Sequence, residues 1–477
     1  MTKPTVSLQE LRAKIGHRAK SAPSHRFWGM FVHIAKLETL ESAYLAAKSK
    51  DGAAGSDGET FESIEEAGRG SFLEKLATEL RTGTYKPLPN RRKEIPKGDG
   101  SGKVRTLSIP AIRDRVVQGA IRLILEPIFE VDFSDSSFGA RPGRNAHQAL
   151  SKVCDGLRRR RLHIADVDLR RYFDCIRHDR IMAKVARRIC DGDVLALIKK
   201  FLKTCGAQGV PQGSPLSPLL GNLALNDLDH ALDRGANFLT YARYLDDMVV
   251  LAPDSEKGRK WVDRALNRIR EEAADIGVSL NEDKTRTVTM TEPDATFAFL
   301  GFDLRWARSP RTGTWYARMT PQRKKVTSVL REVRDTLRKS RHLQDRDAVA
   351  RINPIVRGWA NYFREGTSTE ALHRVRYEVE LKVRHFAAKK RGRKGYGWKR
   401  WSNDVVYGRW GLYDDYAPAY LKRKRAPDVR NHKPEGMTPP RRAEYGKSVR
   451  SVRCGGGRKR SDGGTREAPS TERDGHR

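Results

Sequence analysis

The sequence predicts an α+β protein built on a sheet, with one hairpin that carries adjacent acids at its turn. Residues 238–252, FLTYARYLDDMVVLA, contain aromatic and branched types that favour strands, and the acids Asp246 and Asp247 interrupt the run. Other strand patterns alternate with helical patterns around this segment, which indicates a sheet packed against helices. Past Pro321, Lys and Arg recur at helical spacings with apolar residues between them. We therefore expect a sheet-containing region followed by basic helices.

Helical patterns precede the hairpin. Between residues 28 and 45, apolar residues recur mostly three or four positions apart, which predicts an N-terminal helix. The glycines of residues 50–58 predict a tight loop after it, and a second helix is expected near residues 72–80. Residues 111–130 are also expected to be helical.

Two strand patterns also lie before the hairpin. Residues 85–110 combine prolines, a glycine-rich turn and alternating apolar residues, which predicts two strands joined by a mobile loop that Lys97 and Arg105 flank. Taken alone, this segment fits a solvated basic loop equally well. Residues 162–167 predict a short strand that ends at Asp168. An acid at a strand end is a familiar catalytic placement, although a lone example is more often a helix cap.

Loops rich in glycine and proline lead into the remaining helices. Residues 137–150 predict a glycine-punctuated loop followed by a helix, and residues 209–232 predict a loop followed by an apolar helix. Gln212 lies in the second loop, where glycine lets the backbone approach a ligand closely. Strands are expected within residues 277–285 and at 297–304.

The charge of the chain points to a polyanionic partner. A formal net charge of +35 and a pI near 10.2 exceed what solubility requires, so nucleic acid is the first candidate and an anionic membrane surface the second. No apolar run approaches the length of a membrane span, and the first residues do not resemble a secretory signal. Five cysteines occur without a C-x-x-C pair, which predicts neither a zinc module nor disulfides and fits a reducing cytoplasm.

The acids are the candidate catalytic residues. On its own, an Asp-Asp pair such as Asp246 and Asp247 is more often a solvated turn. Asp168 changes this interpretation, because one acid at a strand end and two at a hairpin turn form the layout of a two-metal site. Two Mg²⁺ ions about 4 Å apart would then activate a hydroxyl and steady the leaving oxygens. The sequence has no Walker loop, G-x-S-x-G or H-E-x-x-H that would indicate other chemistry.

Several ordered motifs resemble the reverse transcriptases encoded by bacterial group II introns. YLDD, DLRRYFD and PQGSPLSPLLGN resemble the palm, and GAAGSDG resembles an extra N-terminal block of these enzymes. RTLSIPAIRDRVVQGAI and SFGARPGRNAHQAL are similar to fingers motifs, and LNEDKT and FLGF to the two blocks after the active site. INPIVRGWANYFREGTSTEALHRVRYEVE is similar to the maturase domain, which binds intron RNA. The resemblance covers roughly residues 25–420.

The resemblance implies a right-hand polymerase with fingers, a β-sheet palm carrying the YLDD hairpin, an α-helical thumb and maturase domain, and a basic tail. The expected divisions are an N-terminal extension with the start of the fingers at 1–90, fingers and palm at 91–310, a helical thumb at 311–345, a maturase-like domain at 346–421 and a disordered tail at 422–477.

The resemblance also implies roles for single residues. Asp168, Asp246 and Asp247 would hold the catalytic Mg²⁺ ions, the first two most directly. The nucleotide-binding residues implied by the family are Lys97 and Arg105 on the triphosphate, Phe173 as the ring that excludes a ribose 2′-hydroxyl, Gln212 beside nucleotide and template, and Lys284 near the departing pyrophosphate. For Phe173, an ordinary core ring is the alternative.

Three departures from the family pattern are expected to matter. Leu245 stands where Ala is commonest, so a bulkier side chain would lie near the primer end. Arg170 and Arg171 replace the usual Lys-Gly after the first acid. Only Cys454 lies beyond residue 205, so the paired cysteines of an HNH endonuclease are lacking and second-strand cleavage is not expected. Nicking of a DNA target by the purified protein would contradict that expectation.

The leading hypothesis is an RNA-directed DNA polymerase that also acts as a maturase. Its expected partners are group II intron RNA, an RNA template with a DNA primer, deoxynucleoside triphosphates and a DNA target, and its expected place is the bacterial cytoplasm near the nucleoid. It would assist splicing and intron mobility by target-primed reverse transcription. The alternatives are a domesticated reverse transcriptase in DNA repair or phage defence, and a splicing factor with a vestigial polymerase site. Aromatic residues of the C-terminal part could stack on unpaired bases, although core packing is the commoner role: Trp359, Tyr362, Phe363, Trp398, Trp401 and Trp410.

Overall fold

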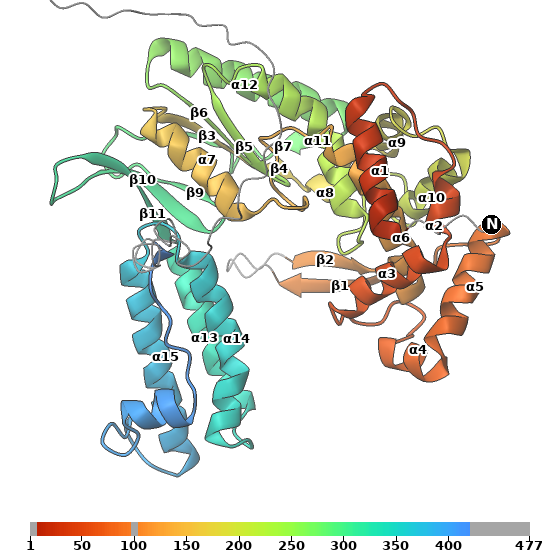
Figure 1. Ribbon diagram of the computed structural model, residues 1–477. Helices are drawn as coiled ribbons and strands as arrows, with labels where there is room; N and C mark the ends of the chain where they lie inside the picture. Colours follow the sequence, from red (N-terminus) through yellow and green to blue (C-terminus); the bar gives the residue numbers. More distant parts are fainter. Residues whose placement is uncertain (1–6, 97–103, 420–477) are drawn as a thin grey trace, which may run out of the picture. The chain divides into compact units, whose positions relative to one another are not determined.

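The computed structural model describes residues 7–96 and 104–419 (Figure 1). Lys97 and the tail expected to be disordered from residue 422 lie outside the described residues. Arg105 is placed by its backbone alone. Among the described residues, no helix is both long enough and apolar enough to cross a membrane.

The N-terminal region contains six helices, one of which is buried among the others. They are α1 (Leu8–Ser21), α2 (Met30–Ile34), α3 (Leu37–Lys48), α4 (Phe61–Ala67), α5 (Arg69–Arg81) and the buried α6 (Ile112–Glu130), which packs against α1, α2 and α3. The single helix predicted at 28–45 is wrong: α2 and α3 are separate, because Lys36 has an extended backbone and caps α3. The exposed Trp28 precedes both helices and lies outside the core.

The predicted strand pair around residue 100 is confirmed. β1 (Arg91–Pro96) and β2 (Val104–Ile109) pair antiparallel, with Arg91 opposite Ile109 and Pro96 opposite Val104. β1 is exposed along its whole length, so this hairpin projects from the core rather than joining the central sheet.

The central sheet has the strand order β5-β6-β3-β8 and is antiparallel throughout. Its strands are β3 (His163–Val167), β5 (Thr240–Tyr244), β6 (Asp247–Ala252) and β8 (Arg286–Thr289). α7 (Ala146–Arg158) packs on one face, and α12 (Glu256–Asp275) with α11 (Ser217–Asp233) lie with the other (Figure 1). Most residues of β3, β5 and β6 are buried on both faces of the sheet, whereas Asp247 at the start of β6 is exposed.

Short elements connect the sheet to its helices. β4 (Leu169–Arg170) pairs with β7 (Ser279–Leu280), and α8 (Tyr172–Cys175), α9 (His178–Ala186) and α10 (Gly192–Lys203) follow β4 in the chain. α7 begins after Asn145, whose side chain accepts a hydrogen bond from the Gln148 backbone, while the Gln148 side chain accepts one from the Asn145 backbone. This reciprocal cap fixes the start of the helix predicted after the glycine-rich loop.

A second sheet and a helical bundle make up the C-terminal part. β9 (Phe297–Phe299), β10 (Phe302–Arg308) and β11 (Trp315–Pro321) form an antiparallel sheet. β11 lies inside the segment 311–345 that was expected to be helical, because its backbone pairs with β10 over seven residues. The helices α13 (Arg323–Lys339), α14 (Asp345–Phe363) and α15 (Thr369–Lys390) lie side by side, followed by a π-helical turn at Asp404–Arg409 (Figure 1).

The helical bundle is held together by the apolar stripe read from the sequence. Val326, Val329, Val333 and Leu337 of α13 are all buried. Most of the aromatic candidates for base stacking are core residues: Trp359, Phe363, Trp401 and Trp410 are buried, whereas Trp398 is 47% exposed.

Candidate active site

The sequence-predicted acids meet at one edge of the central sheet. Asp168 directly follows β3, and Asp246 and Asp247 form the turn and the first residue of β6. Val167 lies opposite Met248 in the β3–β6 ladder, so the same register continued by one residue sets Asp168 beside Asp247. The structure therefore brings together two of the predicted acids, Asp168 and Asp247, which are 79 residues apart in the chain.

Electrostatic repulsion is concentrated at this edge. Desolvation, together with the carboxylates of Asp246, Asp166 and Asp168, raises the pKa of Asp247 to about 6. The Asp247 side chain is exposed to solvent. Repulsion by the neighbouring carboxylates is therefore a better-supported cause of the raised pKa than desolvation. A cation at this edge would relieve that repulsion.

Asp166 is a site residue that the sequence reasoning missed. It lies two positions before Asp168 on β3, so both side chains leave the same face of the strand. Burial raises the pKa of Asp166, and Arg286 on the neighbouring strand β8 opposes the shift from 3.4 Å. The D-x-D spacing in a strand was the signal that could have identified it.

The loop after β7 holds Asp168 in place. The Asn281 side-chain amide donates to Asp168 Oδ2 at 2.7 Å, and the Asn281 backbone N–H donates to the Asp168 carbonyl at 2.8 Å. Lys284 Nζ lies 3.5 Å from the same Oδ2 atom. The predicted residue Lys284 is thus part of the site, as an ion-pair partner of the first acid.

The donor types fit a divalent cation, but the acids do not converge on one point. Carboxylates in mutual repulsion are the oxygen ligands that Mg²⁺ and related cations prefer. Across residues 7–96 and 104–419, however, no three His, Cys, Asp or Glu side chains lie close enough together to hold a metal ion. One oxygen of Asp168 instead lies beside the ammonium of Lys284.

The turn between β5 and β6 is strained. Leu245, a non-glycine residue, has a φ of 58°, in the left-handed region that a two-residue hairpin turn normally fills with glycine. Gly139 packs directly against it: a Cβ atom at Gly139 would lie 2.5 Å from the Leu245 backbone nitrogen. Leu245 thus faces the glycine-rich loop before α7.

The remaining nucleotide-binding candidates are joined through backbone contacts. The Gln212 carbonyl accepts from the Ser108 N–H of β2 at 2.9 Å, which ties the loop of Gln212 to the strand that carries Arg105. The Phe173 carbonyl accepts from Val210 N–H at 2.7 Å in the same loop. Phe173 is partly buried, with its ring 5.0 Å from that of Tyr172, so one part of the ring remains accessible.

The arginines that follow the first acid are engaged with other acids. Arg170 lies 3.9 Å from Asp283 and Arg171 lies 3.3 Å from Asp174, and all four side chains are at least 40% exposed. Exposed pairs of this kind contribute little to stability.

Comparison with known proteins identifies the family. A family described as reverse transcriptase (RNA-dependent DNA polymerase) matches residues 95–304, and the maturase-specific domain of group II introns matches residues 326–404. Protein YkfC of Escherichia coli is 33% identical in an alignment of 355 residues, with a coverage of 63% of this chain and 89% of YkfC. The chain belongs to the group II intron reverse transcriptases with a maturase domain. It is therefore an RNA-directed DNA polymerase by class, with the right-hand fold of mixed helices and sheets that this class has.

A more distant relative of this reverse transcriptase agrees with this assignment. The group II intron-encoded protein LtrA of Lactococcus lactis is 26% identical in an alignment of 379 residues, with a coverage of 64% of this chain and 61% of LtrA. Among solved structures, a telomerase from Candida albicans in complex with a fragment of telomeric RNA matches 73% of this chain and 67% of its own, with a TM-score of 0.37 and 13% identity. Similarity at that level supports no conclusion about this chain.

Proposed function

We propose that this reverse transcriptase copies an RNA template into DNA from a DNA primer at the edge of the central sheet, and that its C-terminal helices bind group II intron RNA. The observation that carries the first part is the meeting of Asp168, Asp246 and Asp247 at one sheet edge. Primer extension on an RNA template with deoxynucleotides and Mg²⁺ is the direct test.

Asp168, Asp246 and Asp247 would hold two Mg²⁺ ions. The chemistry that such bound ions supply is activation of the primer hydroxyl and neutralisation of charge on the phosphates. Lys284 would neutralise the charge of Asp168 before the ions bind, because its ammonium lies 3.5 Å from that carboxylate. Once the ions bind, the same ammonium would lie near the phosphates. We also propose that Lys97 and Arg105 contact the triphosphate and that Gln212 positions the nucleotide against the template.

Phe173 is proposed as the ring that selects deoxynucleotides. Its partly accessible ring lies on α8, which begins four residues after Asp168. Phe173→Val should raise the kcat/KM for ribonucleotides relative to deoxynucleotides about 10- to 100-fold, the range expected when a pocket contact of this size is removed. Single-nucleotide incorporation with matched dNTP and rNTP measures that ratio, and the dNTP reaction serves as the internal control. An unchanged ratio would make Phe173 an ordinary packing residue.

A basic groove supports the proposed binding of RNA. A groove of about 920 Å³ lies between α13 and α15. Its lining includes Glu378, His385, four apolar or aromatic residues and the following cations: Arg334, Arg338, Arg341, Lys382, Lys389 and Lys390. Cations spaced along two helices suit the phosphates of folded RNA, which would explain why this part of the chain is so basic.

Removing two of these cations should weaken RNA binding in a salt-dependent way. Replacing Arg338 and Lys389 together by alanine is expected to lower the slope of log K against log salt by about 2, because each lost phosphate contact removes about one unit. Filter binding to intron RNA over a salt series measures the slope. Lys257 and Lys260 on α12, also exposed, form the matched control pair, and an equal loss in both double variants would mean that the groove has no special role.

We propose further that the bound intron is carried to a DNA target and copied there by target-primed reverse transcription. A splicing factor without polymerase activity is the second candidate, and one observation favours it: among the described residues, the acids do not converge as a metal site. Intron RNA binding with no primer extension in either Mg²⁺ or Mn²⁺ would select this candidate.

A further inference from the structure

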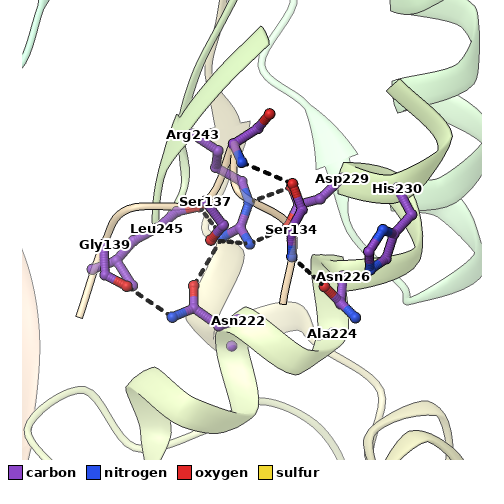
Figure 2. Close-up of polar contacts among 12 residues, drawn as sticks. Ser134, Ser137, Gly139, Asn222, Ala224, Asn226, Asp229, His230, Arg243 and Leu245 are labelled. Carbon is purple, nitrogen blue, oxygen red and sulfur yellow. Dashed lines mark hydrogen bonds and ion pairs between the residues drawn. The ribbon is translucent and has the colours of Figure 1, made fainter. Parts of the chain in front are cut away.

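Arg243 is a fully buried arginine next to the acidic turn. It lies on β5, three residues before Asp246, and its side chain meets that of Asp229 of α11 (Figure 2). Both side chains are 0% exposed. Its Nε donates to Asp229 Oδ1 at 2.7 Å and its Nη2 to Asp229 Oδ2 at 2.5 Å. Burial opposes the charged guanidinium, but Asp229 more than offsets this and raises the pKa of Arg243 above its usual value. Arg243 therefore stays charged inside the protein.

The other donors of Arg243 reach three separate segments. Nη1 donates to the Asn222 side-chain oxygen at 3.0 Å and to the carbonyl of Leu245 at 2.9 Å, and Nη2 donates to Ser137 Oγ at 2.8 Å (Figure 2). With the two bonds to Asp229, all five N–H groups of the guanidinium have a partner. A lysine has three donors in a different geometry and cannot reproduce this set.

These bonds lock the turn between its neighbours. Asn222 also donates to the carbonyl of Gly139 at 2.8 Å, and Gly139 is the residue packed against the Leu245 backbone. The backbone of Arg243 itself bonds to the same loop, accepting from Phe138 N–H and donating to the Ser136 carbonyl. Helix α11, the glycine-rich loop and the hairpin are thus held at one point.

A left-handed leucine needs such support. A non-glycine residue with positive φ persists only where the surrounding structure over-determines its conformation. The Leu245 carbonyl, fixed by Arg243, belongs to the peptide that leads into Asp246. A rotation of that peptide would change the direction in which Asp246, the next residue, points.

We propose that Arg243, Asn222 and Asp229 are positioning residues, which hold the Leu245 turn so that the Asp246 carboxylate points to the site. This inference rests on the proposed role of Asp246 as a metal ligand. On this proposal the Arg243–Asp229 pair orients a catalytic residue. A buried ion pair without this role would only stabilise the core.

The test uses variants that keep the charge or remove a single amide. Arg243→Lys and Asn222→Ala are compared with Arg384→Lys, a matched buried arginine on α15 that pairs with Glu380 at 2.8 Å. Thermal unfolding checks folding, and primer extension in the full-length protein gives kcat and the KM for dNTP. Hydrogen exchange of the amides at residues 244–247 reports the turn without any activity.

For Arg243→Lys and Asn222→Ala we expect kcat to fall about 100-fold, the effect of a misplacement near 1 Å, with the KM for dNTP changed less than about threefold. Amide exchange at residues 244–247 should be faster in both, while Arg384→Lys should leave kcat and this exchange as in wild type. If Arg243→Lys does not fold, Asn222→Ala decides. The proposal would be overturned if Asn222→Ala folds and keeps the wild-type kcat, whether or not the KM for dNTP changes. Wild-type activity of Asp246→Ala would instead overturn the proposed function.

Discussion

Replacing Asp246 by alanine is expected to abolish primer extension. The carboxylate lies at the turn that meets Asp168 across the sheet edge, and its loss would remove a ligand of the proposed metal site. Metal ions contribute several kcal/mol of transition-state stabilisation, so we expect kcat to fall by about three orders of magnitude or more. Steady-state extension on an RNA template, with Mg²⁺ and then Mn²⁺, measures the loss.

A nearby acid provides the control for this prediction. Asp283 is 87% exposed in the loop that also holds Asn281 and Lys284, and its ion pair with Arg170 is long, at 3.9 Å. Asp283→Asn removes one negative charge from the same neighbourhood and should leave kcat within about twofold, because exposed pairs contribute little. Equal losses in the two variants would show that only the local charge matters and that Asp246 is not a ligand.

Local patterns predicted the elements that carry the acids. Strand-forming residues on both sides of Asp246 and Asp247 predicted the β5–β6 hairpin, and the short apolar run before Asp168 predicted β3. The stripe of α13 was equally readable, because its valines follow the helical repeat. In each case the pattern lies within one element, which is why the sequence alone was sufficient.

Contacts between distant segments were beyond such patterns. Asn281 reaches Asp168 across 113 residues, and Arg243 reaches Ser137 across 106. Arg243 alternates with apolar residues on β5 and gave no sign that it would be buried, since arginine is rarely buried unless it is paired. Its partner Asp229 lies in an apolar helix that contains several other polar residues, so the sequence pattern did not single it out.

Leu245 gained a structural explanation that the sequence did not provide. The expectation was a bulkier side chain near the primer end. A Cβ atom at Gly139 would lie 2.8 Å from Leu245 Cγ, so the leucine packs over a residue that has no side chain. The larger residue at the turn and the glycine in the facing loop therefore form one packing unit.

Asp229→Ala is expected to cost the protein about 3–5 kcal/mol of unfolding free energy, because it leaves Arg243 charged and unpaired in the core. Chemical denaturation measures this loss, and the slope of unfolding free energy against denaturant concentration should be the same in the wild type and the variant. The exposed pair of Lys260 and Glu256 is the control, and Lys260→Ala should cost less than about 1 kcal/mol. A loss of similar size in both variants would mean that the buried pair is not held as the contacts indicate.

Replacing both partners separates stability from positioning. In the double variant Arg243→Met with Asp229→Leu, no charge is left unpaired, and apolar pairs of similar volume often restore most of the stability of a buried ion pair. The methionine cannot donate to the Leu245 carbonyl, however, so the turn would lose the bond that fixes it. We therefore expect the double variant to recover most of the unfolding free energy lost in Asp229→Ala while its kcat stays low. Recovery of both stability and kcat would show that the buried pair serves the core alone.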